Sequence, residues 1–429
     1  MPQEPLTFNA HQAPPRRFLL LQGLQGPFFQ SLGSALRKAG HCVWKVNFNG
    51  GDWLFWRLGG NIEYRGNEKR WRFHCRQIIK RHHITDVVLF GDCRPLHRIA
   101  VKLCKQMGVR VHVFEEGYIR PDWVTLENHG VNANSSLPRD PAWYLQEAAK
   151  LPPRRAHHRV PSSFLRRALE GVAYNTADLV TRPLYPGWKD YRPWHPLQEG
   201  VGWLRRLSRR KKVQQQSEKV FDHLSAGMPY MLFPLQLDAD AQIRLHSGFT
   251  GMTPAIEQVI RSFASYAPTH MHLVIKEHPL DNGLRNWENI IQDVARQHHV
   301  EGRVHFMGIG DIERLVTGAE GVVTVNSTVG TLALHRGIPV HAMGRAVYAI
   351  KDITHQGALD GFWRNPPKPD PQTWAAFKRV LIQRALISGG FFSDEGLQKL
   401  CRSAIARMTA PEQMDEPELL LPQPTDATD

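Results

Sequence analysis

Short apolar runs bounded by turn residues recur along this chain and alternate with longer stretches of helical periodicity. This alternation is typical of βαβ units on a parallel sheet. In the N-terminal half we expect strands at 18–22, 42–46, 86–90 and 110–114 and helices at 28–38, 68–81 and 96–107. In the C-terminal half we expect strands at 230–233, 272–275, 304–306, 321–325 and 339–342 and helices at 253–266 and 286–298. The pattern predicts an α/β fold of two Rossmann-like domains.

The length of 429 residues suffices for two domains of ordinary size. We expect an N-terminal domain at 16–215 and a C-terminal domain at 217–409. Within the first, residues 135–216 are rich in Pro, Arg and Trp and are predicted to form a basic insertion and linker. Residues 410–429 are acidic, contain Pro and lack periodicity, which predicts a disordered tail.

The net charge of +14 favours an anionic partner, which could be a nucleic acid, a phospholipid surface or an acidic sugar nucleotide. No helix-turn-helix, RNP or zinc pattern accompanies the charge, so we expect no nucleic-acid binding. The five cysteines form no CxxC pair, which favours a reducing compartment without a disulfide framework or a zinc site. No stretch reaches the length of a membrane span, and we expect a cytoplasmic protein that is soluble or bound to a membrane surface.

Polar clusters follow the predicted strands at their carboxyl ends, where open parallel sheets bind their ligands. In the first half they are Gly23 and Gly26 with Pro27, then 91–94, which includes Arg94, and 115–121, which includes Glu115, Glu116, Tyr118 and Arg120. In the second half they are Asp238 and Asp240, then Lys276 to Pro279 with His278, and Asn326 to Gly330 with Ser327 and Thr328. Both halves therefore supply residues to a predicted cleft.

The clusters of the second half suit an anionic ligand. Small hydroxyl residues at the 326–330 turn expose backbone N–H groups to a phosphate or carboxylate, although simple capping of the next helix is the more ordinary explanation of the motif taken alone. Lys276 and His278 supply a fixed charge and a titratable donor where a nucleotide phosphate must be held, and Pro279 stiffens their turn.

Two pairs of carboxylates are candidates for catalysis. Glu115 or Glu116 could be a general acid or base, or could form an ion pair with Arg120 or Arg94. Asp238 and Asp240 could provide a nucleophile and its neighbour. They also spell the metal-binding DxD pattern, but the Rossmann-like architecture argues against a metal, and we expect none.

Two further features suggest contact with an acceptor or a membrane. The glycines at 23 and 26 lack the spacing of a dinucleotide fingerprint and would permit close approach of a sugar or lipid headgroup. The basic run at 205–212, beside Trp203, suits an anionic bilayer, with a solvated linker as the alternative.

Several motifs resemble the KpsS/LipB family of capsule-synthesis proteins. They are LLLQGLQGPFF (19–29), KVNFNGGDWLFW (45–56), YRG (64–66), LFGDCRPLHRIA (89–100), FEEGYIRPDWVTLE (114–127), FPLQLDADAQI (233–243), KEHPLD (276–281), VNSTVGTLAL (325–334) and the stretch 344–363. The resemblance spans residues 16 to 400 in order. It implies a GT-B-like fold and a retaining β-Kdo transferase that moves Kdo from CMP-Kdo to phosphatidylglycerol or its lyso form. The Kdo linker of a capsular polysaccharide would then begin at the cytoplasmic face of the inner membrane, beside the proteins of capsule synthesis and export.

The resemblance also implies roles for individual residues. Lys276, His278, Ser327 and Thr328 would surround the phosphate and carboxylate of CMP-Kdo, with Pro279, Asn326 and Gly330 completing the donor site. The N-terminal half would present the lipid, and Gly23, Gly26, Arg94, Tyr118 and Arg120 are the expected acceptor-binding residues. A Q-x-x-x-D pattern runs from Gln236 to Asp240 and implies that Asp240 is the nucleophile, with Asp238 less favoured.

Two other functions fit the same sequence. An enzyme of the same fold could elongate the Kdo linker instead of starting it. A non-catalytic scaffold of the capsule synthesis and export complex would explain the basic linker, but it would not need polar groups that converge on a cleft.

Overall fold

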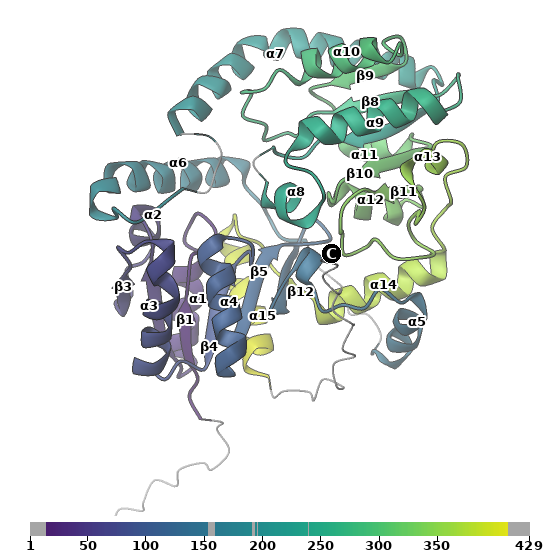
Figure 1. Cartoon of the computed structure of the whole chain (residues 1–429). Helices are drawn as coiled ribbons and strands as arrows, with labels where there is room; N and C mark the ends of the chain where they lie inside the picture. Colours follow the sequence, from purple (N-terminus) through teal and green to yellow (C-terminus); the bar gives the residue numbers. More distant parts are fainter. Residues whose placement is uncertain (1–13, 153–158, 191–193, 195, 239, 411–429) are drawn as a thin grey trace, which may run out of the picture.

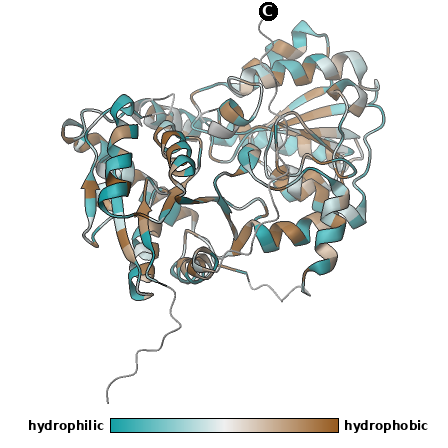
Figure 2. Cartoon of the chain, turned by 60° about the horizontal axis from the view of Figure 1, so that its bottom comes forward, coloured by the Kyte–Doolittle hydropathy of each residue, from teal (hydrophilic) through white to brown (hydrophobic). Residues whose placement is uncertain are grey.

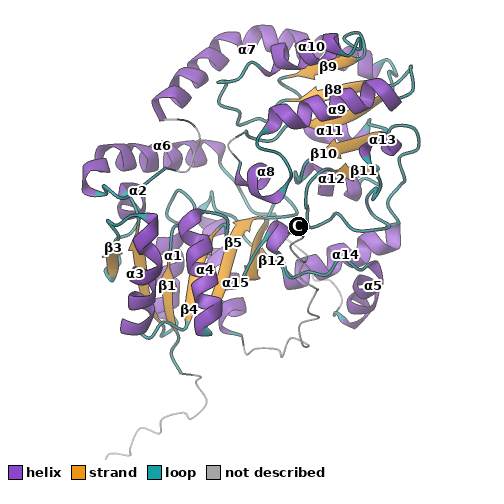
Figure 3. Ribbon diagram, viewed as in Figure 1, coloured by secondary structure: helices purple, strands orange, loops and turns teal. Residues whose placement is uncertain are grey.

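The protein forms two α/β units in a computed structural model that describes residues 14–152, 159–190, 194, 196–238 and 240–410 (Figure 1). The predicted tail at 410–429 lies, except for Ala410, outside these residues. Helices cover both faces of each sheet (Figure 3). The fold is GT-B-like, as predicted.

The first sheet has seven strands in the order β12-β6-β5-β4-β1-β2-β3. Its strands are β1 (Arg17–Leu20), β2 (Cys42–Asn47), β3 (Asn61–Glu63), β4 (Asp86–Phe90), β5 (Arg110–Glu116), β6 (Trp123–Asn128) and β12 (Leu386–Ser388). The helices α1 (Phe28–Lys38), α2 (Gly50–Leu54), α3 (Glu68–Arg81) and α4 (Pro95–Met107) connect its parallel strands. All five residues of β4 are buried because helices cover both faces of this central strand.

The second sheet has five parallel strands in the order β11-β10-β7-β8-β9. They are β7 (Tyr230–Pro234), β8 (His272–Lys276), β9 (Val304–Met307), β10 (Gly321–Thr324) and β11 (Val340–Ala342). The helices of this unit are α8 (Ala241–His246), α9 (Met252–Tyr266), α10 (Trp287–Gln297), α11 (Ile312–Thr317), α12 (Val329–His335) and α13 (Leu359–Phe362). Asn286 caps α10 by accepting a hydrogen bond from Asn289 N, as expected at a helix N-terminus. The strands of both sheets are mostly hydrophobic (Figure 2).

The chain returns to the first unit near its C-terminus, which the predicted boundary at 409 did not anticipate. Helix α14 (Pro371–Arg384) leads into β12, which pairs antiparallel with β6. Helix α15 (Asp394–Thr409) then buries Leu400 in the same core cluster as Phe28 of α1. The second domain therefore ends before β12, because 386–409 complete the first sheet and its cover.

The predicted insertion at 135–216 folds largely as helices. They are α5 (Pro141–Lys150), α6 (Phe164–Val180) and α7 (Pro196–Ser225), with a short 3-10 turn at Arg182–Leu184. Helix α6 lies against α2, and the contact requires glycine, because a Cβ on Gly51 would come within 2.6 Å of the Tyr174 ring. Helix α7 crosses the predicted boundary at 215–217 without a break. Among the described residues, no helix is long and apolar enough to span a membrane.

Candidate active site

The carboxyl ends of the two sheets face each other, and side chains from both units interact there. Glu115, at the end of β5, and Asp240, just before α8, are close enough for the charge of one to affect the other. Glu116 interacts in the same way with His278, which follows β8. A third pair, Cys93 and His246, joins the β4–α4 loop to α8. The structure thus brings together the predicted clusters of both halves.

The surroundings of Glu115 favour its protonated form. Burial raises the pKa of Glu115 to about 8, the negative charges of Glu116 and Asp240 act in the same direction, and Arg94 opposes them. One carboxylate oxygen accepts a hydrogen bond from Glu116 N at 3.0 Å. Such a carboxyl can release and take up a proton near neutral pH, as a general acid or base must.

Glu116 has the opposite environment. Its carboxylate forms ion pairs with Arg120 at 2.5 Å and with Arg167 of α6 at 2.7 Å. These two guanidinium groups hold the pKa of Glu116 below its ordinary value despite burial. The predicted ion pair with Arg120 is therefore confirmed for Glu116, and Glu115 is the neighbour that is suited to proton transfer.

The two aspartates after β7 also differ. Asp238 accepts hydrogen bonds from Met252 N at 2.8 Å and from Arg285 Nε at 2.9 Å, so its carboxylate fixes the loop. Asp240 lies just before α8, where its carbonyl accepts a hydrogen bond from Ile243 N, and its carboxylate affects Glu115 across the cleft. Asp240 is therefore the member of this pair whose charge acts on the first unit.

Gln236 joins the loops that follow two neighbouring strands. Its amide nitrogen donates to Asn326 Oδ1 at 2.8 Å, and its amide oxygen accepts from Asn326 N at 3.0 Å. This paired hydrogen bond connects the loop after β7 with the loop after β10. Gln236 therefore positions the segment that carries Asp240 relative to the 326–330 turn.

His278 is a neutral hydrogen-bond donor at the same edge. Its Nδ1 accepts a hydrogen bond from Leu280 N at 3.0 Å, which leaves the ring proton on Nε2. Burial and the neighbouring arginines lower the pKa of His278 to about 4. At neutral pH the side chain can therefore donate a hydrogen bond to a departing phosphate without carrying a charge. The carbonyl of the next residue, Pro279, accepts from Arg206 at 2.9 Å.

Lys276 points into the protein. Its ammonium donates to the carbonyls of Glu277 at 2.9 Å and Gly308 at 3.1 Å, and burial lowers the pKa of Lys276 to about 8. The lysine thus ties together the ends of β8 and β9. Its predicted contact with a donor phosphate requires the ammonium to leave these carbonyls.

The N-cap residue of α12, Thr328, makes no side-chain capping hydrogen bond, and the contact with the start of the helix comes from Ser327 before it. Ser327 Oγ accepts a hydrogen bond from Val329 N at 3.2 Å, and the Thr328 carbonyl accepts from the Thr331 hydroxyl at 2.7 Å. A Cβ on Gly330 would lie 2.3 Å from the Tyr348 hydroxyl, which explains the glycine by packing. Asn326, Ser327 and Thr328 remain partly exposed beside Gln236.

The predicted acceptor-binding residues separate into two groups. Gly23 accepts a hydrogen bond from Arg94 through its carbonyl at 3.2 Å, and Gly26 adopts a φ of +126° next to Glu170. Tyr118, in contrast, is buried, and its hydroxyl bridges Glu127 and the backbone of residue 132. Its side chain belongs to the core and not to the cleft surface, because its hydroxyl is held by the buried Glu127.

A buried polar network behind the cleft was not singled out from the sequence. Lys45 and Asp52 form an ion pair at 3.6 Å, and the Tyr174 hydroxyl donates to Asn49 at 3.0 Å. Gln22 donates to the same hydroxyl at 2.8 Å. Three of these residues lie in the 45–56 motif. The run of polar residues after a strand in this motif was the sequence signal that could have revealed the network. Tyr174 had none, because it comes from the segment predicted to be a linker.

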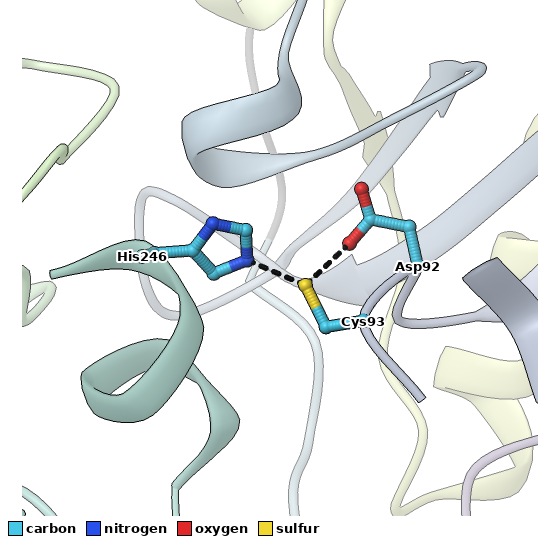
Figure 4. A group of neighbouring side chains, drawn as sticks. All are labelled: Asp92, Cys93 and His246. Atoms are coloured by element: carbon cyan, nitrogen blue, oxygen red, sulfur yellow. Dashed lines mark hydrogen bonds between the residues drawn. The ribbon is translucent and has the colours of Figure 1, made fainter. Parts of the chain in front are cut away.

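Asp92, Cys93 and His246 form the one described group with the donor types of a metal site (Figure 4). The thiol lies 3.1 Å from Asp92 Oδ1 and 2.8 Å from His246 Nε2. Two ligands of a tetrahedral zinc ion lie ~3.5 Å apart, given the usual metal–sulfur and metal–nitrogen distances. Moreover, His246 Nδ1 finds no hydrogen-bond partner among the described residues, whereas a metal-bound histidine usually has one. The geometry fits a hydrogen-bonded contact between the units better than a metal site.

A pocket of about 560 Å³ lies elsewhere, between α9 and the segment around β11. Its walls include Arg261, His341 and Asp360 but none of the predicted site residues. All of its lining residues come from the second unit. It therefore lacks the convergence of both units that defines the candidate active site.

Two facing Rossmann-like units with polar groups at their opposed strand ends define a GT-B-like protein. Residues 85–392 match the model of the family described as capsule polysaccharide biosynthesis protein. The chain belongs to this family.

Named relatives agree with this assignment. The capsule polysaccharide export protein KpsS of Escherichia coli is 33% identical over 379 residues, which cover 88% of this chain and 97% of that protein. The capsule polysaccharide modification protein LipB of Neisseria meningitidis serogroup A is 32% identical, over 88% of this chain and 91% of its own length. Among solved structures, the β-Kdo 2,7 transferase of Thermosulfurimonas dismutans KpsC is 13% identical with a TM-score of 0.43, over 92% of this chain and 100% of that one.

Proposed function

We propose that this protein is a retaining β-Kdo transferase that moves Kdo from CMP-Kdo to phosphatidylglycerol or lyso-phosphatidylglycerol. The reaction would start the poly-Kdo linker of a capsular polysaccharide at the cytoplasmic face of the inner membrane. Capsule synthesis and export proteins are the expected partners. Membership of the capsule family supports the pathway, and the resemblance of the motifs supports the donor and acceptor.

The observation that carries the proposal is the approach of Glu115 to Asp240 across the two units. One carboxylate can attack the sugar while the other, whose pKa is raised to about 8, exchanges a proton. Retaining sugar transfer requires two such groups with separate roles. A scaffold would not require a carboxyl whose pKa lies near neutrality inside a polar cleft.

In the first displacement Asp240 attacks C2 of Kdo, the bond from C2 to the phosphate oxygen breaks, and CMP leaves. His278 Nε2–H and the partly exposed side chains of Asn326, Ser327 and Thr328 would bind the anionic groups of the donor. No acid is needed for the leaving group, because a phosphate departs as an anion that these donors stabilise.

In the second displacement an acceptor hydroxyl attacks C2, the bond from C2 to Asp240 breaks, and the hydroxyl proton goes to Glu115. The adduct itself prepares this step. An ester at Asp240 carries no charge, so the repulsion that helps to raise the pKa of Glu115 disappears once the adduct forms. Burial still favours the protonated form, but Glu115 now releases its proton to solvent more readily, and the resulting carboxylate is the base.

The proposal is tested with CMP-Kdo generated in situ and a fluorescent phosphatidylglycerol or lyso analogue, with the product read by mass. Wild type should add one Kdo, and Asp240→Ala should add none. Transfer only to a Kdo-primed acceptor would establish elongation instead. A lack of transfer to both acceptors would contradict the proposal and favour the scaffold.

A further inference from the structure

Large exposed apolar side chains are concentrated in one part of the chain. Sixteen such residues are exposed in the described part of the chain, and eleven of them lie between positions 164 and 207. These residues belong to α6, the short turn after it and the first turns of α7. Figure 1 places α6 and the start of α7 on the same side of the molecule, at the left of the view. Concentrations of this kind mark interaction surfaces.

Helix α6 turns its apolar face outward. Leu165, Leu169, Val172 and Leu179 recur at helical spacing, and their exposed fractions are 67%, 60%, 64% and 42%. The opposite face holds Arg167, which pairs with Glu116, and Tyr174, which is buried against α2. The polar face of this helix therefore packs on the protein, and its apolar face has no covering segment among the described residues.

The charge around this face indicates what covers it. Residues 159–212 contain twelve Lys and Arg residues and four Asp and Glu residues, a net charge of +8. In α7 the side chains of Arg205, Arg209, Arg210, Lys211 and Lys212 are all exposed. An outward apolar helix face beside clustered basic residues is the pattern of proteins that lie on anionic bilayers.

We propose that the outward face of α6, with the first turns and basic run of α7, is a docking surface for an anionic phospholipid bilayer. The inference rests on the proposed function, because it explains how a lipid acceptor reaches the cleft. The inner face of the same helix carries the arginine that holds Glu116, next to Glu115. A helix with its side chains is ~10 Å across, so a docked α6 brings the headgroup region within about one helix diameter of the cleft.

Vesicle flotation tests the surface without any donor or reaction. Wild type should float with vesicles of 30% phosphatidylglycerol in phosphatidylcholine and stay unbound with pure phosphatidylcholine. The triple variant Leu165→Gln/Leu169→Gln/Val172→Gln should bind at least ~10-fold more weakly, since each change removes exposed apolar area from the interface. Phe73→Gln, which alters an exposed apolar residue of α3, is the matched control and should bind like wild type.

The basic run is tested separately with Arg205→Gln/Arg209→Gln/Lys212→Gln. This variant should bind more weakly at low salt and lose most of the salt dependence that wild type shows. Unchanged binding of the triple α6 variant, or failure of wild type to bind the anionic vesicles, overturns the proposal. A dimer that the α6 substitutions dissociate would assign the face to a second copy of the chain instead.

The transfer assay separates this inference from the proposed function. On a short-chain lyso-phosphatidylglycerol kept below its micelle concentration, the triple α6 variant should match wild type, because no docking is needed. On vesicles it should lose transfer in proportion to binding. If the triple variant also lost transfer to the dissolved acceptor, these side chains would belong to the acceptor site. That result would overturn membrane docking as their role. If wild type binds vesicles but transfers nothing, the surface stands and the proposed function fails.

Discussion

Glu115 and Asp240 belong to different units of the fold, and their charges act on each other across the interface between them. Glu115 is the second-last residue of a strand of the first sheet, and Asp240 follows a strand of the second. Each unit alone contains half of this pair. Any motion that separates the units would therefore weaken the interaction and lower the pKa of Glu115.

The raised pKa of Glu115 makes stability depend on pH. The native state holds a proton on Glu115 up to about pH 8, whereas an unfolded glutamate loses it near its ordinary pKa of 4.5. The native state binds more protons in this window, so this group lowers the free energy of unfolding as pH rises from about 4.5 to 8. Glu115→Gln removes the effect. Its melting temperature relative to wild type should rise between pH 5 and pH 9, and a constant difference would contradict the assignment.

Glu115→Gln should also separate the two displacements. The glutamine cannot accept the acceptor proton, so the second displacement should slow by ~10²-fold or more, the usual contribution of a general base. Release of CMP in the first turnover should stay fast. Rapid-quench measurement of CMP should show a burst in the variant, and slow release of the first CMP would place Glu115 in the first step instead.

The ion pair between Glu116 and Arg167 should stabilise the fold only while Glu116 is ionised. Because the pKa of Glu116 is lowered in the native state, the ion pair contributes stability above the ordinary pKa of glutamate. This stability disappears as pH falls through the pKa that Glu116 has in the native state. Arg167→Ala should lower the melting temperature by ~2 °C at pH 7, since a partly exposed pair is worth up to about 1 kcal/mol.

The difference between Arg167→Ala and wild type should shrink as the pH falls below the ordinary pKa of glutamate. Arg166→Ala is the control, because Arg166 of the same helix pairs with Glu170 and Asp394 and not with Glu116. An equal pKa of Glu116 in both variants, read by NMR of labelled glutamate, would contradict the role given to Arg167.

Chelators should leave transfer unchanged. Cys93 and His246 are hydrogen-bonded at 2.8 Å, closer than two ligands of one metal ion. Cys93→Ser preserves a hydrogen-bond donor, so its activity should stay within ~3-fold of wild type. Complete loss of one neutral hydrogen bond would cost about 1 kcal/mol. Metal content is read by elemental analysis of the purified protein. Stoichiometric zinc that is lost in Cys93→Ser would show that these three side chains bind a metal after all.

Local sequence signals predicted much of the fold. The helices Phe28–Lys38 and Glu68–Arg81 and the strand Asp86–Phe90 match the expected bounds, because apolar periodicity and turn residues mark both ends. The antiparallel pairing of β6 with β12 was missed, since Val124 and Ile387 are partners about 260 residues apart and neither strand is long. Pairing at such a distance leaves no local pattern.

The sequence predicted which residues belong to the candidate site but not how their side chains are arranged. Strand-end positions identified Glu115 and Asp240 as candidates, yet the effect of one charge on the other depends on how the two units pack. The same rule selected Tyr118, whose side chain turns into the core, and Lys276, whose ammonium binds backbone carbonyls. Arg167 was missed because α6 carries its apolar residues on the outside, opposite to the usual arrangement on which periodicity arguments rely.

We expect Asp240 to form the covalent adduct with Kdo, and peptide mass mapping can locate that adduct. Glu115→Gln is incubated with CMP-Kdo without acceptor, quenched in acid and digested. We predict one added Kdo on the peptide that contains Asp240. Asp240→Asn should show no such adduct, and Asp238→Asn should still show it. An adduct on another residue, or a substrate turnover that proceeds with no adduct in any variant, would contradict the account.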